Sequence, residues 1–227
     1  MSRTIQQTSE TVALPETAAV PYPLSKQVFD KAVAGILVVV LSPLLLLALV
    51  LIAVDMLFRP ADRGRWLYRE RRISRGREFD VMKFRVIRED VLAEAARKGE
   101  YARLYEKDLG NLTAAGRIVK RVYADELPQL FNILGSDISM VGPRPWPLSM
   151  VRDQIAAGLD YRMHVMAGWT GPAQVRKDSG AKAQAVPLDL EYVELCRTLG
   201  GPALVRHDLR VLSQSIRTVL RGRGLKY

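Results

Sequence analysis

An uncharged apolar run extends from Ala32 to Val54 and carries the pair Ser42-Pro43 near its midpoint. Its length is typical of a membrane helix, since a bilayer core about 30 Å thick needs about 20 helical residues. Proline interrupts the helical hydrogen-bond ladder, and the Ser42 hydroxyl can bond a carbonyl that the proline leaves without a donor. Two structures therefore stay open: a kinked helix that spans the bilayer, and a re-entrant hairpin whose arms each reach about half-way across it.

Basic residues flank this run on both sides. Lys26 and Lys31 precede it, and Arg59, Arg63 and Arg65 follow it. The positive-inside rule places basic residues on the cytoplasmic side of a membrane. Basic residues at both ends suit a hairpin that enters and leaves by the same face, so the flanks support the hairpin without excluding a spanning helix.

The composition limits both the partners and the chemistry. A chain of 227 residues with a net charge of +10 predicts one domain and an acidic partner, which is anionic lipid, nucleic acid or a phosphorylated substrate. One cysteine and two histidines disfavour a disulfide framework, a zinc site and a Ser-His-Asp triad. Catalysis must then rest on carboxylates, arginines and lysines. The chain has no zinc-finger, recognition-helix or RNA-binding signature, so we expect no nucleic-acid partner.

The pattern beyond the apolar run predicts a mixture of helices and short strands. Residues 79–87 alternate as a strand does, and residues 89–107 are typical of a polar helix. Another helix is expected to begin at Asp125-Glu126 in "DELPQLFNIL". Three closely spaced prolines predict an irregular loop over residues 143–147, then a helix to about Met166, and then a turn leading to a strand in "AGWTGPAQV".

Two further segments are predicted to meet other surfaces. Basic residues greatly outnumber acidic ones from Arg63 to Arg88, which favours contact with anionic lipid just after the apolar run. A C-terminal helix is predicted from apolar residues that share one face, and this face either packs on the core or lies on the bilayer. The face comprises Val205, Leu209, Leu212, Ile216 and Val219.

The adjacent carboxylates Asp125 and Glu126 are the first candidates for chemistry. Such a pair is commonly solvated surface or favourable charge at a helix N-terminus. Here it occurs with cations that suit a diphosphate substrate, because they bind phosphate oxygens and stabilise a departing charge. One carboxylate of the pair is able to hold a divalent metal and the other to attack phosphorus. The candidate cations are Lys83, Arg85, Lys120, Arg121, Arg144 between Pro143 and Pro145, and Arg176.

Several ordered motifs resemble those of one family. The motifs are "FDKAVAGILVVVLSPLLLL", "MKFR", "LTAAGRIVKR", "DELPQLFNIL", "SMVGPRP" and "GWTGPAQV". Each is weak alone, but their order and spacing are specific, and they cover the chain from about Lys26 to the C-terminal helix. The chain is similar to the bacterial sugar transferases, which are monotopic polyprenol-phosphate phosphoglycosyl transferases.

This resemblance implies a reaction and roles for particular residues. Family members transfer a sugar 1-phosphate from a nucleotide diphosphate sugar to a polyprenol phosphate such as undecaprenyl phosphate, through a phosphosugar attached to aspartate, and release a nucleoside monophosphate. This reaction starts a surface glycan. Asp125 matches the nucleophile, Glu126 the carboxylate associated with Mg²⁺, and Arg144 the arginine of the proline loop. Ser42-Pro43 matches the kink of the family's re-entrant helix and so favours the hairpin.

The same resemblance implies an architecture and a location. We expect a re-entrant membrane hairpin over residues 25–60 and a helix-rich α/β catalytic domain over 61–227. The resemblance does not cover residues 1–24, whose polar, Thr-rich and Pro-containing sequence predicts a mobile tail. The domain is expected at the cytoplasmic face of the bacterial inner membrane, in contact with anionic lipid, and a homodimer is plausible.

Two positions depart from the family pattern. Lys120 stands where arginine is usual, and Arg176-Lys177 replaces a Gly-Arg pair. A catalytically degenerate membrane scaffold of a glycan pathway is therefore kept as an alternative.

Overall fold

The computed structural model describes residues 19–176 and 185–220, so residues 1–18 of the tail predicted over residues 1–24 lie outside the described residues. Within the described part of that tail, Val20 is buried and its N–H donates to the carbonyl of His164 at 3.0 Å. The described chain is a helix-rich α/β protein with small sheets, as predicted. Its helices are α1 (Leu24–Val40), α2 (Ser42–Phe58), α3 (Glu89–Lys98), α4 (Ala114–Arg121), α5 (Gln129–Leu134), α6 (Leu148–Ala156), α7 (Pro172–Val175), α8 (Ala185–Thr198) and α9 (Gly201–Leu220). The strands are β1 (Leu67–Ser74), β2 (Arg77–Phe84), β3 (Ser139–Val141) and β4 (Gly168–Thr170).

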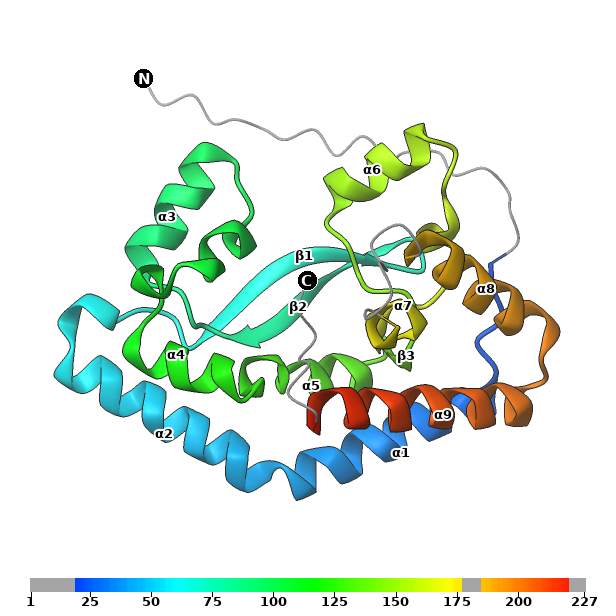
Figure 1. Cartoon of the computed structure of the whole chain (residues 1–227), viewed down its shortest axis with the longest axis horizontal. Helices are drawn as coiled ribbons and strands as arrows, with labels where there is room; N and C mark the ends of the chain where they lie inside the picture. The colour runs from blue at the N-terminus through cyan, green and yellow to red at the C-terminus, as the bar shows by residue number, and fades with distance from the viewer. Residues whose placement is uncertain (1–18, 177–184, 221–227) are drawn as a thin grey trace.

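The apolar run forms α1 and α2, which meet at a bend of 59°. The bend lies at the predicted Ser42-Pro43 pair. Ser42 Oγ donates to the carbonyl of Val39 at 2.7 Å, and Pro43 occupies the first turn of α2, where a helix tolerates proline. Among the described helices none is long and apolar enough on its own to cross a bilayer, whereas α1 and α2 meet that requirement together. In Figure 1 the two arms form an open V along one side of the molecule.

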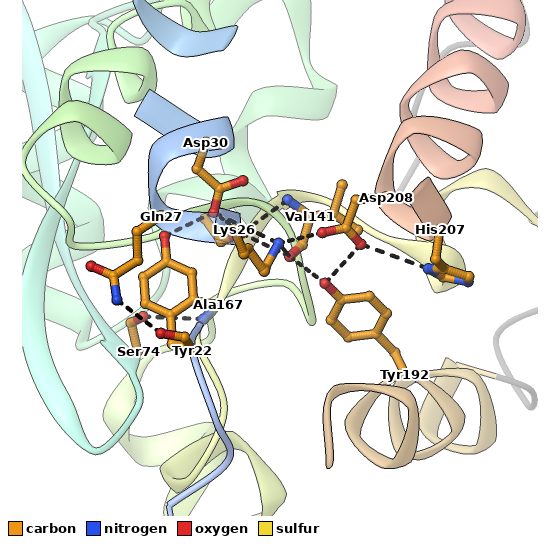
Figure 2. A network of polar contacts seen from close by, with 11 residues as sticks. Tyr22, Lys26, Gln27, Asp30, Ser74, Val141, Ala167, Tyr192, His207 and Asp208 are labelled. Carbon is orange, nitrogen blue, oxygen red and sulfur yellow. Dashed lines mark hydrogen bonds and ion pairs between the residues drawn. The ribbon is translucent and has the colours of Figure 1, made fainter. Parts of the chain in front are cut away.

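The N-terminal arm joins the rest of the protein through a buried polar network, drawn in Figure 2. Lys26 of α1 is 2% exposed and forms ion pairs with Asp208 of α9 and, at 3.6 Å, with Asp30. Tyr192 of α8 donates to Asp208 at 3.0 Å and to the carbonyl of Val141 in β3 at 2.9 Å. The expectation that Lys26 marks a membrane flank is therefore wrong, because its ammonium is enclosed by carboxylates.

The second arm joins through carboxylates at the N-terminus of α4. Asp55 of α2 accepts a hydrogen bond from the backbone N–H of Ala115 at 2.8 Å, and Asp62 accepts from that of Ala114 at 3.3 Å. Thr113 caps the same helix by accepting from the N–H of Gly116 at 2.8 Å. Helix N-termini carry N–H groups without partners inside the helix, and a carboxylate there also meets the positive end of the helix dipole. α2 is thus fixed against the helix that leads to the candidate carboxylates.

Two large hydrophobic clusters form most of the described core, and Ile73, Val151 and Met163 form a smaller third cluster. One gathers α1, α5, β3, α8 and α9 and includes Ala34 and Leu130. The other gathers α2, β2 and α4 and includes Ile52, Phe84 and Val119. Figure 1 shows α4 and α5 between the V of α1 and α2 and the strands β1 and β2. Each arm of the V therefore packs on a different part of one continuous body.

The sheets are two-stranded. β1 and β2 pair antiparallel from Leu67 opposite Phe84 to Ser74 opposite Arg77, and β2 confirms the strand predicted within residues 79–87. β3 and β4 pair parallel, with Val141 opposite Thr170. A Cβ atom on Gly168 would lie 2.0 Å from the backbone N of Gly142, so only glycine permits this close approach.

Several predicted elements have different bounds. The helix expected over residues 89–107 ends at Lys98, because Gly99 adopts a left-handed conformation, and residues 102–107 form a 3₁₀ helix, η2 (Ala102–Lys107). The helix expected to reach Met166 ends at Ala156, two residues before Gly158, whose φ is +81°. "AGWTGPAQV" was expected to be a turn and then a strand. It is instead strand β4 and then helix α7, because Pro172 is suited to the first turn of a helix.

The C-terminal helix exists, but the face predicted for it coincides only in part with the face that packs on the core, through Leu212. The packed face carries Leu204, Asp208 and Val211, whereas Leu209 and Ile216 are 51% and 60% exposed. The reason is that Asp208 is buried through its ion pair with Lys26, so a polar position belongs to the core face. The side chain of Val219 lies outside the described residues.

Candidate active site

A cavity of about 570 Å³ opens between the β1–β2 hairpin, the end of α4 and the loop after β3. Seven of the residues that line it are lysine or arginine and four are aspartate or glutamate, including Asp125 and Glu126. An excess of cations over anions in a concave site favours a ligand that carries several negative charges. Four of the predicted phosphate-binding residues line this cavity, namely Lys83, Lys120, Arg121 and Arg144.

A backbone reversal after α4 brings the two carboxylates to the cavity. The helix ends at Arg121, and Tyr123 adopts a left-handed conformation with φ +58°. This conformation costs a non-glycine residue on the order of 1–2 kcal/mol. The next residues form a single 3₁₀ turn, η4 (Ala124–Glu126), which precedes α5. The sequence therefore predicted a helical start at Asp125-Glu126 nearly correctly, but the carboxylates lie on a separate turn before the helix.

Asp125 is 6% exposed and has a strongly perturbed pKa. Burial first, and the negative charge of Glu126 second, raise the pKa of Asp125 to about 7. Within the described residues no hydrogen bond to its carboxylate is found. A buried carboxylate that ionises near neutral pH and bears little compensation is suited to nucleophilic attack or proton transfer.

Glu126 is compensated by two cations at a single oxygen. Lys83 Nζ donates to Glu126 Oε1 at 2.8 Å, and Arg144 Nη2 lies 3.4 Å from the same atom. Burial alone would raise the pKa of Glu126, but Lys83 and Arg144 outweigh that effect and hold its pKa at about 2. The environment thus separates the pKa values of two adjacent carboxylates, which is how sites divide roles between such groups.

Lys120 and Arg121 enter the site from the last turn of α4. Lys120 forms an ion pair with Glu106 of η2, whereas Arg121 is exposed at the rim of the cavity. A lysine held by a carboxylate presents a point charge rather than a planar fork. We therefore expect Lys120 to contribute charge to the cavity and not a bidentate contact.

Arg85 and Arg176 lie outside this cavity. Arg85 is buried and donates to the backbone carbonyls of Arg65, Ile87 and Asp62 at 2.6–2.8 Å, so it joins the end of β2 to the segment after α2. Burial lowers the pKa of Arg85. Arg176 is 58% exposed at its side chain, approaches Glu191 at 3.9 Å and lines a different cavity beside α8 and α9. Arg176 is not brought to the carboxylate pair, whereas Arg85 lines a small adjoining cavity that Asp125 also lines.

The loop with Pro143, Arg144 and Pro145 is irregular, as predicted, and it is anchored to β4. Gly142 donates to the carbonyl of Thr170 at 2.9 Å, and the carbonyl of Pro143 accepts from Gly168 at 2.8 Å. Proline fixes φ near −65° and removes a backbone donor. The two prolines thus stiffen the chain on either side of Arg144, whose side chain reaches Glu126.

Sequence reasoning missed several residues that line the cavity. Glu106 and Lys107 lie in the segment that was expected to be a polar helix, and Arg72 lies in the stretch that was expected to meet lipid. Tyr68 and Tyr123 also line it. Tyr123 could have been predicted, because it lies two residues before Asp125 in "VYADE" and is close to the carboxylates when the helix ends before it.

The described residues fit a Mg²⁺ site that is completed by substrate phosphates better than a site formed by protein side chains alone. They contain no group of three or more His, Cys, Asp or Glu side chains that could hold a metal. Mg²⁺ is commonly bound by one or two carboxylates together with substrate phosphates and water. Glu126, held as an anion, and Asp125, whose pKa is raised by burial and by the adjacent charge of Glu126, provide such a donor set.

Comparison with known proteins identifies relatives over most of the chain. The family described as bacterial sugar transferase matches residues 22–222. The exopolysaccharide production protein ExoY of Sinorhizobium fredii is 30% identical over 217 residues, which are 88% of each chain. The undecaprenyl-phosphate glucose phosphotransferase of Komagataeibacter xylinus is 35% identical over 182 residues, 75% of this chain and 32% of that one. The UDP-glucose:undecaprenyl-phosphate glucose-1-phosphate transferase of Caulobacter vibrioides is 33% identical over 75% of this chain and 63% of its own.

Proposed function

Because this chain belongs to the bacterial sugar transferase family, we propose that it transfers a sugar 1-phosphate from a nucleotide diphosphate sugar to undecaprenyl phosphate. Relatives over most of the chain carry names for this type of reaction, with glucose or N-acetylgalactosamine as the sugar. The product would be a polyprenol-diphosphate sugar, which is the first lipid-linked intermediate of a surface glycan.

The observation that carries the proposal is the division of roles between Asp125 and Glu126. Lys83 and Arg144 neutralise Glu126, whereas Asp125 is buried beside it with a pKa of about 7. The cations of the cavity suit the charged groups of a diphosphate. This arrangement supports a reaction at phosphorus with Asp125 as the attacking group.

The proposed reaction has two displacements. In the first, a carboxylate oxygen of Asp125 attacks the phosphorus that bears the sugar, and the bond from that phosphorus to the bridging oxygen breaks. The nucleoside monophosphate leaves with the bonding electron pair. In the second, a phosphate oxygen of the polyprenol phosphate attacks the same phosphorus, and the carboxylate of Asp125 leaves. Arg144 and Lys83 are placed to stabilise the negative charge that moves onto the leaving oxygen.

Glu126 and Asp125 are the residues that would hold Mg²⁺, which would supply charge neutralisation for the diphosphate when bound. Lys83 and Arg144 keep Glu126 ionised at neutral pH, so its carboxylate is available without a prior loss of a proton. Asp125 is only 6% exposed, which would limit the access of water to an acyl phosphate formed on it.

The proposed membrane position rests on the outer face of the V. α1 and α2 expose large apolar side chains at Leu24, Val28, Ile36, Val39, Val40, Leu46, Leu47, Val50, Val54, Leu57 and Phe58. An exposed apolar surface of this extent favours lipid contact. We propose that it enters one leaflet as a re-entrant hairpin from the cytoplasmic side of the bacterial inner membrane, and that Leu209 and Ile216 of α9, which packs beside α1, extend it.

This position also reduces the number of basic residues that would contact anionic lipid. Figure 1 places β1 and β2 on the far side of α4 and α5 from α2. In the proposal, the contact that the sequence predicted for residues 63–88 therefore comes from Arg63 and Arg65, near the end of α2, together with Arg59. The arginines of β1 and β2 belong to strands that lie beyond α4 and α5.

Release of nucleoside monophosphate tests the reaction. Purified protein in nanodiscs would be given Mg²⁺, undecaprenyl phosphate and a panel of nucleotide sugars. We expect one donor to be consumed with release of its nucleoside monophosphate, and Asp125→Asn to abolish that release. Asp153→Asn changes an exposed aspartate of α6 in the same way and should keep wild-type turnover.

The same assay separates an enzyme from the catalytically degenerate scaffold. A scaffold would make no lipid-linked product with any donor in the panel. Full turnover by Asp125→Asn would instead show an active enzyme in which Asp125 has no role in the chemistry.

A further inference from the structure

The loop that carries Arg144 has almost no secondary structure, yet nearly all its carbonyls accept hydrogen bonds. The carbonyl of Val141 accepts from Ser139, Tyr192 and, at 3.4 Å, Lys26; part of this network is drawn in Figure 2. Further along the loop, the carbonyls of Pro143, Arg144, Pro145 and Trp146 accept from Gly168, Arg162, Arg72 and Ile73 respectively. Two of these donors are guanidinium groups from distant parts of the chain.

Arg162 donates to the residue whose own side chain reaches the site. Its Nη1 donates to the backbone carbonyl of Arg144. The side chain of Arg144 extends toward Glu126, with Nη2 3.4 Å from Glu126 Oε1. A shift of the Arg144 backbone would therefore displace its guanidinium from Glu126.

Arg162 is itself held on every side. It is 5% exposed, its Nη2 donates to Asp189 Oδ2 at 2.7 Å, and its Nε donates to Gln154 Oε1 at 2.9 Å. Its guanidinium carbon lies 4.2 Å from the ring centre of Trp146. Asp189 belongs to α8, Gln154 to α6 and Trp146 to the loop itself, so three parts of the fold fix one planar group.

Such a buried ion pair is weak evidence for stability, because apolar residues of similar volume often stabilise a protein as well or better. A planar fork with all three nitrogens engaged does define a position, which a flexible lysine cannot do as well. The polar cluster around Arg162 therefore has a geometric role.

We propose that Arg162 is a positioning residue that sets the Arg144 guanidinium against Glu126 by holding the backbone carbonyl of Arg144. The inference rests on the proposed function, in which Arg144 acts at the diphosphate. Arg162 does not line the cavity, so it acts through Arg144 and not on substrate. Arg72 holds the neighbouring carbonyl of Pro145 at 3.2 Å, but it lines the cavity, so substitution of Arg72 would mix positioning with direct binding.

Arg162→Lys is the informative substitution, because it keeps a positive charge beside Asp189 and removes the fork. A misplaced catalytic group typically costs about a hundredfold in rate. We expect kcat to fall by about that factor, with a smaller change in the KM of the nucleotide sugar, because the loss concerns charge stabilised in the transition state. Arg152→Lys, at an exposed arginine of α6, is the matched control and should leave kcat unchanged.

A double-mutant cycle separates positioning from general damage. If Arg162 acts through Arg144, Arg162→Lys should have no further effect on kcat in a protein that already carries Arg144→Ala. Losses that multiply in the double variant would overturn the proposal. Equal melting temperatures of the Arg162→Lys variant and the wild type would show that unfolding does not cause the loss of kcat. If Arg162→Lys does not fold, the double variant Arg162→Gln with Asp189→Asn takes its place, because it removes both charges of the buried ion pair.

A measurement without turnover keeps this inference separate from the proposed function. The order parameter of the Arg144 Nε–H bond, from ¹⁵N relaxation, should fall from a rigid value of about 0.85 to below about 0.6 in Arg162→Lys. Equal order parameters in the two proteins would overturn the positioning role. A wild-type protein that turns over no donor would contradict the proposed reaction, while the order parameter would still decide the role of Arg162.

Discussion

Lys83 and Glu126 form an ion pair across the cavity, with Lys83 Nζ 2.8 Å from Glu126 Oε1. Lys83 and Glu126 lie 43 positions apart in the chain, and their contact joins β2 to the turn that carries both carboxylates. Because Lys83 neutralises Glu126, it also limits the charge that opposes ionisation of Asp125. Lys83 therefore affects the ionisation of both carboxylates, together with Arg144 at Glu126.

Substitution of Lys83 should disable the site without unfolding it. Lys83→Met keeps the length of the side chain and removes its charge, so the pKa of Glu126 should rise and less charge would be compensated in the transition state. We expect kcat to fall by about 10²–10³, as for the loss of a key electrostatic group. Lys98→Met, at an exposed lysine that pairs with Glu94 on α3, is the control. A Lys83→Met protein with more than half of the wild-type kcat would contradict the role of this pair.

Asp125→Asn should make the folded protein more stable at alkaline pH while it abolishes activity. The folded state raises the pKa of Asp125 from an ordinary value near 4 to about 7, so the folded state binds this proton more tightly than the unfolded state does. Stability is therefore full below about pH 4 and declines as the pH rises toward 7, by a few kcal/mol. Asparagine cannot ionise and avoids this loss.

Melting temperatures at pH 5 and pH 8 test this expectation. The advantage of Asp125→Asn over wild type should be several degrees larger at pH 8 than at pH 5, whereas Asp153→Asn should show no such difference. The same advantage at both pH values would mean that burial does not raise the pKa of Asp125.

Lys26 should be essential for docking of α1 and α9. Lys26→Met would leave the carboxylates of Asp208 and Asp30 buried without their cation, which typically costs about 3–5 kcal/mol in the free energy of unfolding. Adding Asp208→Asn should recover part of the loss, because asparagine is uncharged and its oxygen can still accept from Tyr192. Denaturant unfolding of the three proteins provides the measurement. A cost below about 1 kcal/mol for Lys26→Met would show that the network in Figure 2 is not closed as described.

The two ends of the V should be accessible from the same side of the membrane. Ala19→Cys and Ala61→Cys place thiols at exposed positions before α1 and after α2, while the native Cys196 is buried and should stay unreactive. In sealed inside-out vesicles, a membrane-impermeant maleimide should label both positions, and in right-side-out vesicles neither. Labelling of one position in each orientation would instead show a spanning segment.

The sequence predicted the features that depend on local chemistry. The bend lies at Ser42-Pro43 because proline and the serine hydroxyl alter the helix locally, and both residues are visible in the sequence. The strand β2 follows its alternation, and the loop around Arg144 follows its prolines. The carboxylates share one cavity with Lys83, Lys120, Arg121 and Arg144, the cations that the sequence analysis grouped with them, and the roles of these residues are proposals.

What could not be predicted depends on pairing between distant residues. The core face of α9 includes Asp208 because Lys26, near the other end of the chain, is buried against it, and apolar periodicity ignores such a pair. Arg85 is a residue type that commonly binds phosphate, but its guanidinium nitrogens donate hydrogen bonds to three backbone carbonyls. Arg162 lies in no motif that marks it, since only the fold brings its guanidinium to the carbonyl of Arg144. The predicted homodimer stays a prediction.

Capture of the phosphosugar on the protein tests the central claim most directly. Wild-type protein would be incubated with Mg²⁺ and a nucleotide sugar labelled with ³²P at the phosphate that bears the sugar, with no polyprenol phosphate present. We predict that label becomes attached to the protein together with release of about one equivalent of nucleoside monophosphate, that peptide mapping places it on Asp125, and that added undecaprenyl phosphate removes it. Turnover to lipid-linked product with no label on the protein at any time, or with label on a residue other than Asp125, would contradict the account.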